Sequence, residues 1–167
     1  MGAAVSDAYS GQALTDYGAH ALQQGDQERL ALFYALVDGT DITQYTTGVC
    51  YDTVGFCMYL HGRVSLDAVC STVGQDWINV IGFDSGTIWQ GESIDAGYAV
   101  GFKRVGDYSP GYFHAALAIG GTYVRGVNGH VLSPGWSEAV DIAAVLGQAD
   151  ENGQYWYDGQ PIEVHYI

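Results

Sequence analysis

The chain has 167 residues, of which five are Lys or Arg and 19 are Asp or Glu, so its formal net charge is −14. This charge argues against nucleic acid and anionic membranes as partners, because phosphate-binding faces need many cations. Only 14% of the residues are charged and 48% are apolar, which excludes a solvated disordered chain and allows a hydrophobic core.

The first part of the chain carries helical signals. Four helices are predicted: a weak one over 7–24, one from Asp26 to Gly39, one from Cys50 to Gly62, and one after Ser65. Asp26 and Ser65 are residue types that cap helix N-termini, and glycine is the usual residue after a helix ends. Residues 40–49 are predicted to form a loop.

From Trp77 onward the pattern becomes short, strand-like and rich in glycine. Strands are predicted at 87–90, 97–104, 112–119, 122–128, 154–158 and 161–166, with one helix near 137–147 capped by Ser137. Asp158-Gly159 between the last two strands is typical of a tight hairpin turn. The sequence therefore predicts a single α+β domain over 1–167, with helices mainly in 1–75 packed on an antiparallel sheet formed mainly by 76–167.

Three cysteines, Cys50, Cys57 and Cys70, are an odd number, so at least one thiol is free or pairs between chains. Cys50 stands where the predicted loop becomes a helix. A helix N-terminus favours the thiolate, because its unpaired N–H groups point at the sulfur. Cys50 is therefore a candidate nucleophile, whereas the other two thiols lie inside helical stripes and are expected to be buried and inert.

His114 begins a segment that reads as two strands joined at Gly120-Gly121. If the turn centres on Gly121, His114 lies opposite Asn128, whose side-chain oxygen could fix the imidazole tautomer. If Gly120-Gly121 is instead a two-residue turn, Val127 faces His114. The orienting group then comes from elsewhere, for example Glu138, Asp107 or a backbone carbonyl.

A cysteine in the first turn of a helix, a later histidine at the start of a strand and a polar residue on the next strand together resemble the papain-like cysteine hydrolases, including the compact NlpC/P60-type amidases. Gln44 stands six residues before Cys50, where papain places its oxyanion-hole glutamine, and Gly48 stands two before it. Unlike papain, the chain has Tyr51-Asp52 after the cysteine, and Trp136 is the nearest aromatic residue after Asn128. The resemblance implies a papain-like fold.

The resemblance also implies a mechanism. His114 would share the Cys50 proton, the thiolate would attack a carbonyl carbon, and Asn128 would orient the imidazole. The Cys50 N–H and the Gln44 side chain would bind the oxyanion. The expected function is a cysteine peptidase or amidase, including a glutamine deamidase or transglutaminase, acting on a peptide, protein or peptidoglycan-type amide without a metal or cofactor.

The abundance of Tyr and Trp is also typical of a binding surface. The second interpretation is therefore a non-catalytic, acidic binding module for a peptide, glycan or protein partner, in which Cys50 is inert. Asp84, Glu92 and Asp95 form a scattered acidic set that would suit a glycosidase only if the fold gathered them.

The N-terminus has no basic segment followed by an apolar one, so no Sec signal peptide is predicted, and no apolar run is long enough for a transmembrane helix. Gly2 and Ser6 match the short N-myristoylation pattern. A cytoplasmic protein, or an effector toxin delivered by a specialised secretion route, is therefore expected.

Overall fold

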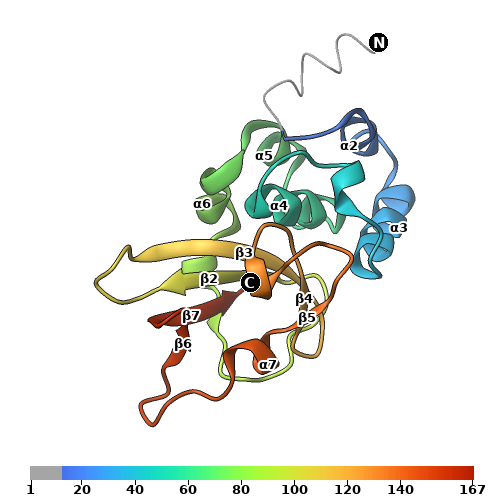
Figure 1. The fold of residues 1–167 in the computed structure, drawn as a ribbon. Coiled ribbons are helices and arrows are strands. Elements are labelled where there is room, and N and C mark those ends of the chain that lie inside the picture. The colour runs from blue at the N-terminus through green and yellow to red at the C-terminus, as the bar shows by residue number, and fades with distance from the viewer. Residues whose placement is uncertain (1–12) are drawn as a thin grey trace.

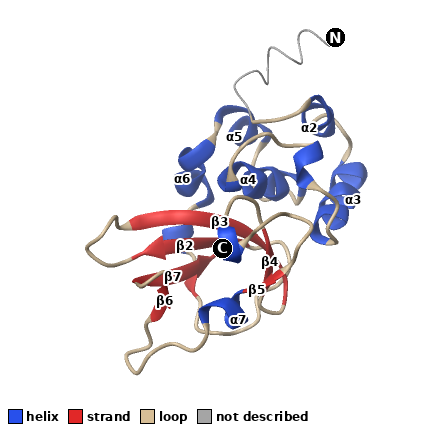
Figure 2. Cartoon of the chain, in the orientation of Figure 1, coloured by secondary structure: helices blue, strands red, loops and turns tan. Residues whose placement is uncertain are grey.

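The computed structural model describes residues 13–167, and within them it contains six α-helices and a seven-stranded antiparallel sheet (Figure 1, Figure 2). The helices are α2 (Asp16–Ala21), α3 (Asp26–Val37), α4 (Cys50–Leu60), α5 (Leu66–Ser71), α6 (Trp77–Ile81) and α7 (Ile142–Leu146). The predicted α+β class is confirmed. The N-myristoylation pattern at Gly2 and the first part of the predicted helix 7–24 lie outside the described residues.

The sheet has the order β1-β7-β2-β3-β4-β5, and β6 pairs with β7 beside this path. Its strands are β1 (Thr87–Ile88), β2 (Ala99–Arg104), β3 (Gly111–Gly120), β4 (Tyr123–Arg125), β5 (Val140–Asp141), β6 (Tyr155–Tyr157) and β7 (Gln160–Tyr166). Figure 2 shows α2 to α6 gathered on one side of the sheet and α7 on the other. The C-terminal strand β7 therefore lies inside the sheet, next to β2.

Strand β3 separates two hydrophobic cores, because successive side chains of a strand point to opposite faces. Ala115 and Leu117 pack in the core beneath the helices, together with Cys50. Ala116 and Ala118 pack in the second core, which contains Phe102 and Trp89 on the far side of the sheet.

Helix α4 is the centre of the first core, and all its residues are buried. It contacts β3, α3, α5 and α6. Gly55 permits the crossing with α6, because a Cβ at this position would lie 2.3 Å from a ring carbon of Trp77. The all-round apolar surface of this helix is typical of a buried helix rather than of an amphipathic surface helix.

Several predicted elements are confirmed and others are wrong. The helix after Ser65 begins as expected, since the Ser65 hydroxyl accepts from the Ala68 N–H at 3.0 Å. The turn between β6 and β7 has positive φ at Asp158 and Gly159, as the hairpin signal predicted.

The errors concern short elements. Trp77 begins α6 rather than a strand-like segment, because its ring is buried against α4. The predicted helix 137–147 is only α7, preceded by β5 and capped by Asp141 instead of Ser137. Asp26 is the first residue of α3, whose N-cap is Gly25.

Two side chains from the sheet half bind the C-terminal end of α3. Arg125 on β4 donates from Nε to the Val37 carbonyl at 2.8 Å and from Nη1 to the Trp136 carbonyl at 3.0 Å. The Trp136 indole N–H donates to the Leu36 carbonyl at 2.8 Å. The Arg125 Nε bond satisfies the Val37 carbonyl at the helix end, and the Trp136 indole adds a second donor to the Leu36 carbonyl, which also accepts from the Gly39 N–H. Together these bonds join α3 to the sheet half of the chain.

We expect Arg125→Met to lower the free energy of unfolding by about 1–3 kcal/mol, since it leaves a part-buried carbonyl without its charged donor. Urea denaturation measures this change. Lys103→Met is the matched control, because it removes the same charge from an exposed pair with Asp84 at 3.1 Å and should cost less than about 1 kcal/mol. Equal losses in the two variants would contradict the role given to Arg125.

Candidate active site

Cys50 is the first residue of α4, as predicted, and its side chain is buried. The start of the helix is fixed by Asp52, whose carboxylate accepts from the Val49 N–H at 2.9 Å and from the Gly74 N–H at 2.8 Å. Gly48 is needed here, because a Cβ at this position would lie 2.2 Å from the Asp52 carboxylate. Val49, just before the cysteine, is 47% exposed, whereas Cys50 itself is 6% exposed.

Burial is the largest influence on the Cys50 thiol and raises its pKa. The backbone N–H groups of Ala115, Tyr51 and Cys50 itself lower the pKa of the thiol. The nearby charge of Asp52 raises it further. The sequence led us to expect a thiol pKa lowered by the helix N-terminus. That expectation is wrong for this structure, because desolvation outweighs the N–H donors.

His114 lies in β3 and is only 2% exposed. Its ring lies over that of Phe102, the residue paired with it on β2, with 5.4 Å between the centroids. Its Nε2 atom lies 2.9 Å from the Ser133 hydroxyl. Gly129 covers the same edge of the ring, since a Cβ there would lie 2.4 Å from His114 Nε2.

The hydrogen bonds of Ser133 determine the tautomer of His114. The Ser133 hydroxyl donates its one proton to the Leu132 carbonyl at 2.5 Å, so it accepts from His114 Nε2–H. His114 Nδ1 therefore carries a lone pair. This atom is buried, and it has no hydrogen-bond partner among residues 13–167. A buried polar atom without a partner is uncommon in folded proteins, and the Nδ1 atoms of His61 and His165 share this feature here.

Burial, and to a smaller extent the neighbouring His130, lowers the pKa of His114 from its ordinary value of 6.5 to about 4. The imidazole is therefore neutral at pH 7. Because the thiol pKa is raised, both candidate groups are uncharged in the resting protein.

Asn128 does not take the position predicted for it. The register centred on Gly121 is present, since Leu117 pairs with Arg125 and Ala118 with Val124. However, β4 ends at Arg125, and Asn128 lies beyond it with an exposed side chain and a positive φ of 58°. Ser133 is the residue that bonds His114 instead.

Gln44, the predicted oxyanion donor, ends the short 3-10 helix η1 (Ile42–Gln44), and its side chain is exposed. Its backbone carbonyl accepts from the Thr15 hydroxyl at 2.6 Å. No hydrogen bond joins its amide to Cys50 in the described part of the chain.

The Cys50 thiol lies against the backbone beside His114 and packs in the core beneath the helices, whereas the His114 ring packs on Phe102 of the far core. The N–H of Ala115, which follows His114 directly, donates toward the Cys50 thiol. No hydrogen bond between the Cys50 sulfur and His114 Nδ1 is present. A β-bulge between β2 and β3 places both Phe113 and His114 against Phe102, which interrupts the alternation of β3 at this point.

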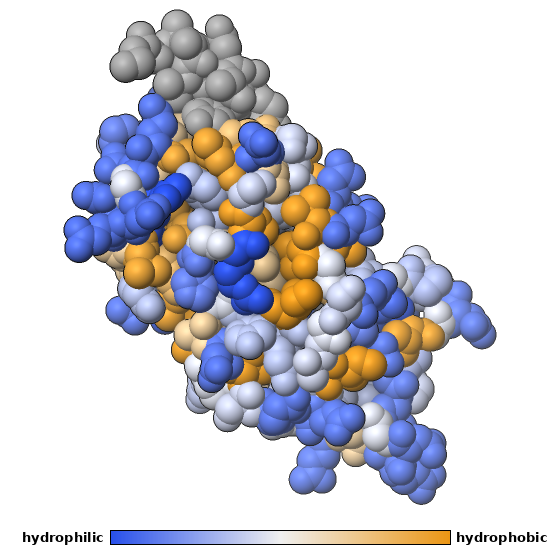
Figure 3. All heavy atoms as spheres, turned by 180° about the vertical axis from the view of Figure 1, so that it is seen from behind, coloured by the Kyte–Doolittle hydropathy of each residue, from blue (hydrophilic) through white to orange (hydrophobic). Residues whose placement is uncertain are grey.

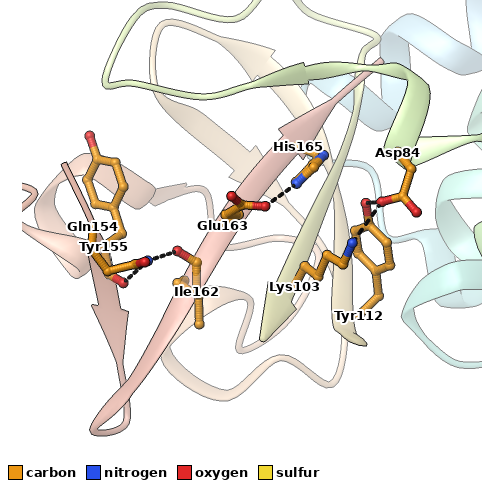
Figure 4. Close-up of polar contacts among 8 residues, drawn as sticks. All are labelled: Asp84, Lys103, Tyr112, Gln154, Tyr155, Ile162, Glu163 and His165. Carbon is orange, nitrogen blue, oxygen red and sulfur yellow. Dashed lines mark hydrogen bonds and ion pairs between the residues drawn. The ribbon is translucent and has the colours of Figure 1, made fainter. Parts of the chain in front are cut away.

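A second polar cluster lies on β2, β3 and β7 and is drawn in Figure 4. The Tyr112 hydroxyl donates to Asp84 at 2.7 Å, Lys103 pairs with the same carboxylate, and His165 Nε2 lies 3.0 Å from Glu163. The Tyr112 and Lys103 contacts lower the pKa of Asp84. These contacts hold Asp84 at the strand end two residues before His114.

Ser133 is the site residue that the sequence analysis missed. It lies in the irregular loop that follows the 3-10 helix η4 (His130–Leu132), where no periodicity reveals which side chain points inward. The signal that could have found it is weak: a small hydroxyl residue between Leu132 and Pro134, in a loop that must return toward the sheet.

Comparison with models of known protein families and with curated protein sequences finds no match for this chain. Within residues 13–167, no three His, Cys, Asp or Glu side chains gather as a metal site would require. None of the helices in the same range combines the length and apolar character needed to cross a bilayer.

The burial of His114 predicts a pH-dependent contribution to stability. Because folding lowers the pKa from 6.5 to about 4, the unfolded chain binds a proton first, and the contribution is complete above pH 6.5 and lost as the pH falls toward 4. We expect a loss of at most about 3 kcal/mol across this window. Urea denaturation at several pH values should show this slope in the wild type and a shallower one in His114→Gln; parallel curves would contradict it.

Proposed function

We propose that this chain is a papain-like cysteine hydrolase that attacks an amide or peptide bond, with Cys50 as nucleophile and His114 as general base. The observation that carries this proposal is the His114 imidazole. Ser133 holds its Nε2–H, and its Nδ1 lone pair is buried without a donor beside the peptide that contacts the Cys50 thiol. A nucleophile needs a base that is oriented by a third group, and this arrangement supplies one.

The geometry of the loop around His114 supports the same proposal. Asn128 and His130 both adopt positive φ, at 58° and 52°, and place Gly129 between them against the imidazole. Non-glycine residues in this conformation are uncommon and often occur at functional sites. Here the loop excludes water from the imidazole edge that donates to Ser133.

The reaction begins from a neutral pair. His114 Nδ1 accepts the thiol proton as the Cys50 sulfur bonds to the carbonyl carbon, and the carbonyl oxygen takes the electron pair. The imidazolium then protonates the leaving amine as the carbon–nitrogen bond breaks. Water, deprotonated by the same nitrogen, releases the acyl group from sulfur. Because the thiol pKa is raised and that of His114 is about 4, proton transfer accompanies attack rather than preceding it.

The thiol and the imidazole must come within hydrogen-bond distance for this step. Catalytic hydrogen bonds are often long or poorly aligned in free enzymes and tighten when substrate binds; here the His114 ring, which packs on Phe102, must also turn toward the thiol. The backbone N–H groups that begin α4 are the donors best placed for the oxyanion, because they already point toward the Cys50 sulfur. Gln44 would need to turn its exposed side chain inward to join them.

The burial of both groups also favours a second candidate, a non-catalytic binding module. Cys50 is 6% exposed and His114 is 2% exposed, so neither reaches solvent freely. Such a module would use its surface instead. Figure 3 shows apolar and hydrophilic side chains interspersed on the helical half of one face, with a mostly hydrophilic end below.

Thiol labelling together with an activity screen separates the two candidates. We expect iodoacetamide at pH 7.5 to modify Cys50 at least tenfold faster than Cys57, which is fully buried and whose pKa is raised by burial. Mass spectrometry of the digested protein measures both rates, and the urea-unfolded chain, in which the thiols should react alike, is the control.

The screen uses peptide, peptidoglycan-stem and protein-glutamine amides. Cys50→Ala should lower any activity found by at least about 10³-fold, whereas Cys57→Ala should retain it. Equal slow labelling of the two thiols, with no turnover of any amide, would assign the chain to the binding module.

Ser133 is proposed as a positioning residue that acts through His114. We expect Ser133→Ala to lower kcat about tenfold with little change in KM, because the imidazole loses the acceptor that fixes its tautomer. Nitrogen NMR of the His114 ring gives a readout that a merely structural role would not move. The wild type should show the Nε2–H form alone and the variant a mixture, while Asn128→Gly, which removes the side chain and tolerates the positive φ of 58°, should leave the tautomer unchanged. A pure Nε2–H signal in Ser133→Ala would refute this role.

A further inference from the structure

A hollow of about 1040 Å³ opens beside the loop that holds His114. Its aliphatic walls come from both sides: Val131 and Pro134 from the loop, and Ala144 and Val145 from α7. Two carboxylates, those of Glu138 and Asp141, lie in the same lining. We call this hollow the α7 groove.

The α7 groove is one loop away from the candidate base. Asn128 and His130 line the groove, and Gly129 between them packs on the His114 ring. His130 is also close enough to His114 to lower its pKa. A ligand in the groove therefore contacts the outer side of the loop whose inner side fixes the imidazole.

Within residues 13–167, neither carboxylate of the groove forms an ion pair. The five cations are engaged elsewhere: Arg29 with Asp26 and Tyr59, Arg63 with Gly97 and Tyr98, Lys103 with Asp84, Arg104 over Phe113, and Arg125 with Val37 and Trp136. Glu138 is exposed and forms no ion pair within residues 13–167.

Asp141 is partly engaged, and this engagement fixes its position. One oxygen, Oδ1, accepts from the Thr122 hydroxyl at 2.5 Å and from the Ala143 N–H at 3.0 Å. Its other oxygen has no hydrogen bond in the described residues. The groove thus combines an apolar wall with carboxylate oxygens that are available to a donor.

We infer that the α7 groove binds a lysine-type side chain of a peptide, with its aliphatic stem on Val131, Pro134 and Val145 and its terminal cation at Glu138 and Asp141. Long basic side chains bury an apolar stem and keep the charged end near water, which matches this lining. The net charge of −14 also attracts a cation rather than an acidic or neutral ligand. As a substrate subsite the groove rests on the proposed hydrolase function; as a binding site it is tested separately.

The experiment titrates the full-length Cys50→Ala variant, which cannot turn over substrate, with three blocked tripeptides: acetyl-Gly-Xaa-Gly-amide, where Xaa is Lys, norleucine or Glu. Chemical shifts of the backbone amides report the site and the affinity. We expect the Lys peptide to shift Val131 and Val145 and to bind about fivefold more tightly than norleucine at low salt, with this advantage below about twofold at 0.5 M salt. The Glu peptide should bind most weakly.

Two further variants test the groove itself. Glu138→Gln should reduce the advantage of Lys over norleucine to about twofold, whereas Glu28→Gln, which removes the same charge from α3, should leave it unchanged. Ala144→Trp fills the groove from an exposed position and should abolish binding of both peptides.

Equal or tighter binding of norleucine, or shifts confined to other residues, would overturn the inference. Cleavage of amides by the wild-type chain is measured separately. Binding of the Lys peptide without cleavage of any amide would support the lysine-binding groove and contradict the hydrolase function. Cleavage of amide substrates with no preference for Lys would support the hydrolase function and contradict the lysine-binding groove.

Discussion

The candidate site depends on the packing of the first turn of α4 against β3. Asp52 fixes the start of the helix by binding the N–H groups of Val49 and Gly74, and Gly55 lets the helix lie directly on Trp77. These contacts hold the Cys50 thiol against the N–H of Ala115. The backbone of β3 thus contacts the Cys50 sulfur at Ala115, and His114, the preceding residue, carries the imidazole.

The same burial that positions these groups also limits their chemistry. Desolvation raises the pKa of the Cys50 thiol and lowers that of His114 to about 4, so charge separation between them is unfavourable in the free protein. A bound substrate would change this balance, because a polarised carbonyl and its amide add dipoles where water is now excluded. In the proposed reaction the charge therefore develops on the oxyanion, beside the N–H groups of α4, rather than on a standing thiolate.

The sequence predicts those parts of the fold that local signals define. Helix α5 and the hairpin between β6 and β7 follow from Ser65 and from Asp158-Gly159, whose preferences are set by their own backbone. Trp77 could not be assigned in this way, because its helix is stabilised by a contact with Gly55, 22 positions away. Periodicity reports local spacing and cannot reveal such a contact.

In the candidate site, too, the residues that local patterns mark could be predicted, and the residue positioned by distant contacts could not. Cys50 stands at the start of α4, a boundary that local patterns mark, and His114 lies within β3, which its strand-like pattern predicts. The hydrogen-bond partner of His114 depends on where β4 ends and on how the loop after β4 runs back toward the sheet. Two residue pairs between β3 and β4 obey the predicted register, yet Asn128 lies beyond the last paired residue, and Ser133 bonds His114 in its place.

In the two proposals, the loop over 128–134 connects ligand recognition with catalysis. Its inner side carries Gly129 and Ser133 against the imidazole, and its outer side carries Val131 and Pro134 in the α7 groove. A ligand that packs on the outer side restricts the backbone of the loop and with it the hydroxyl that orients His114. Under the two proposals, binding in the groove and orientation of the base would therefore be linked through this loop.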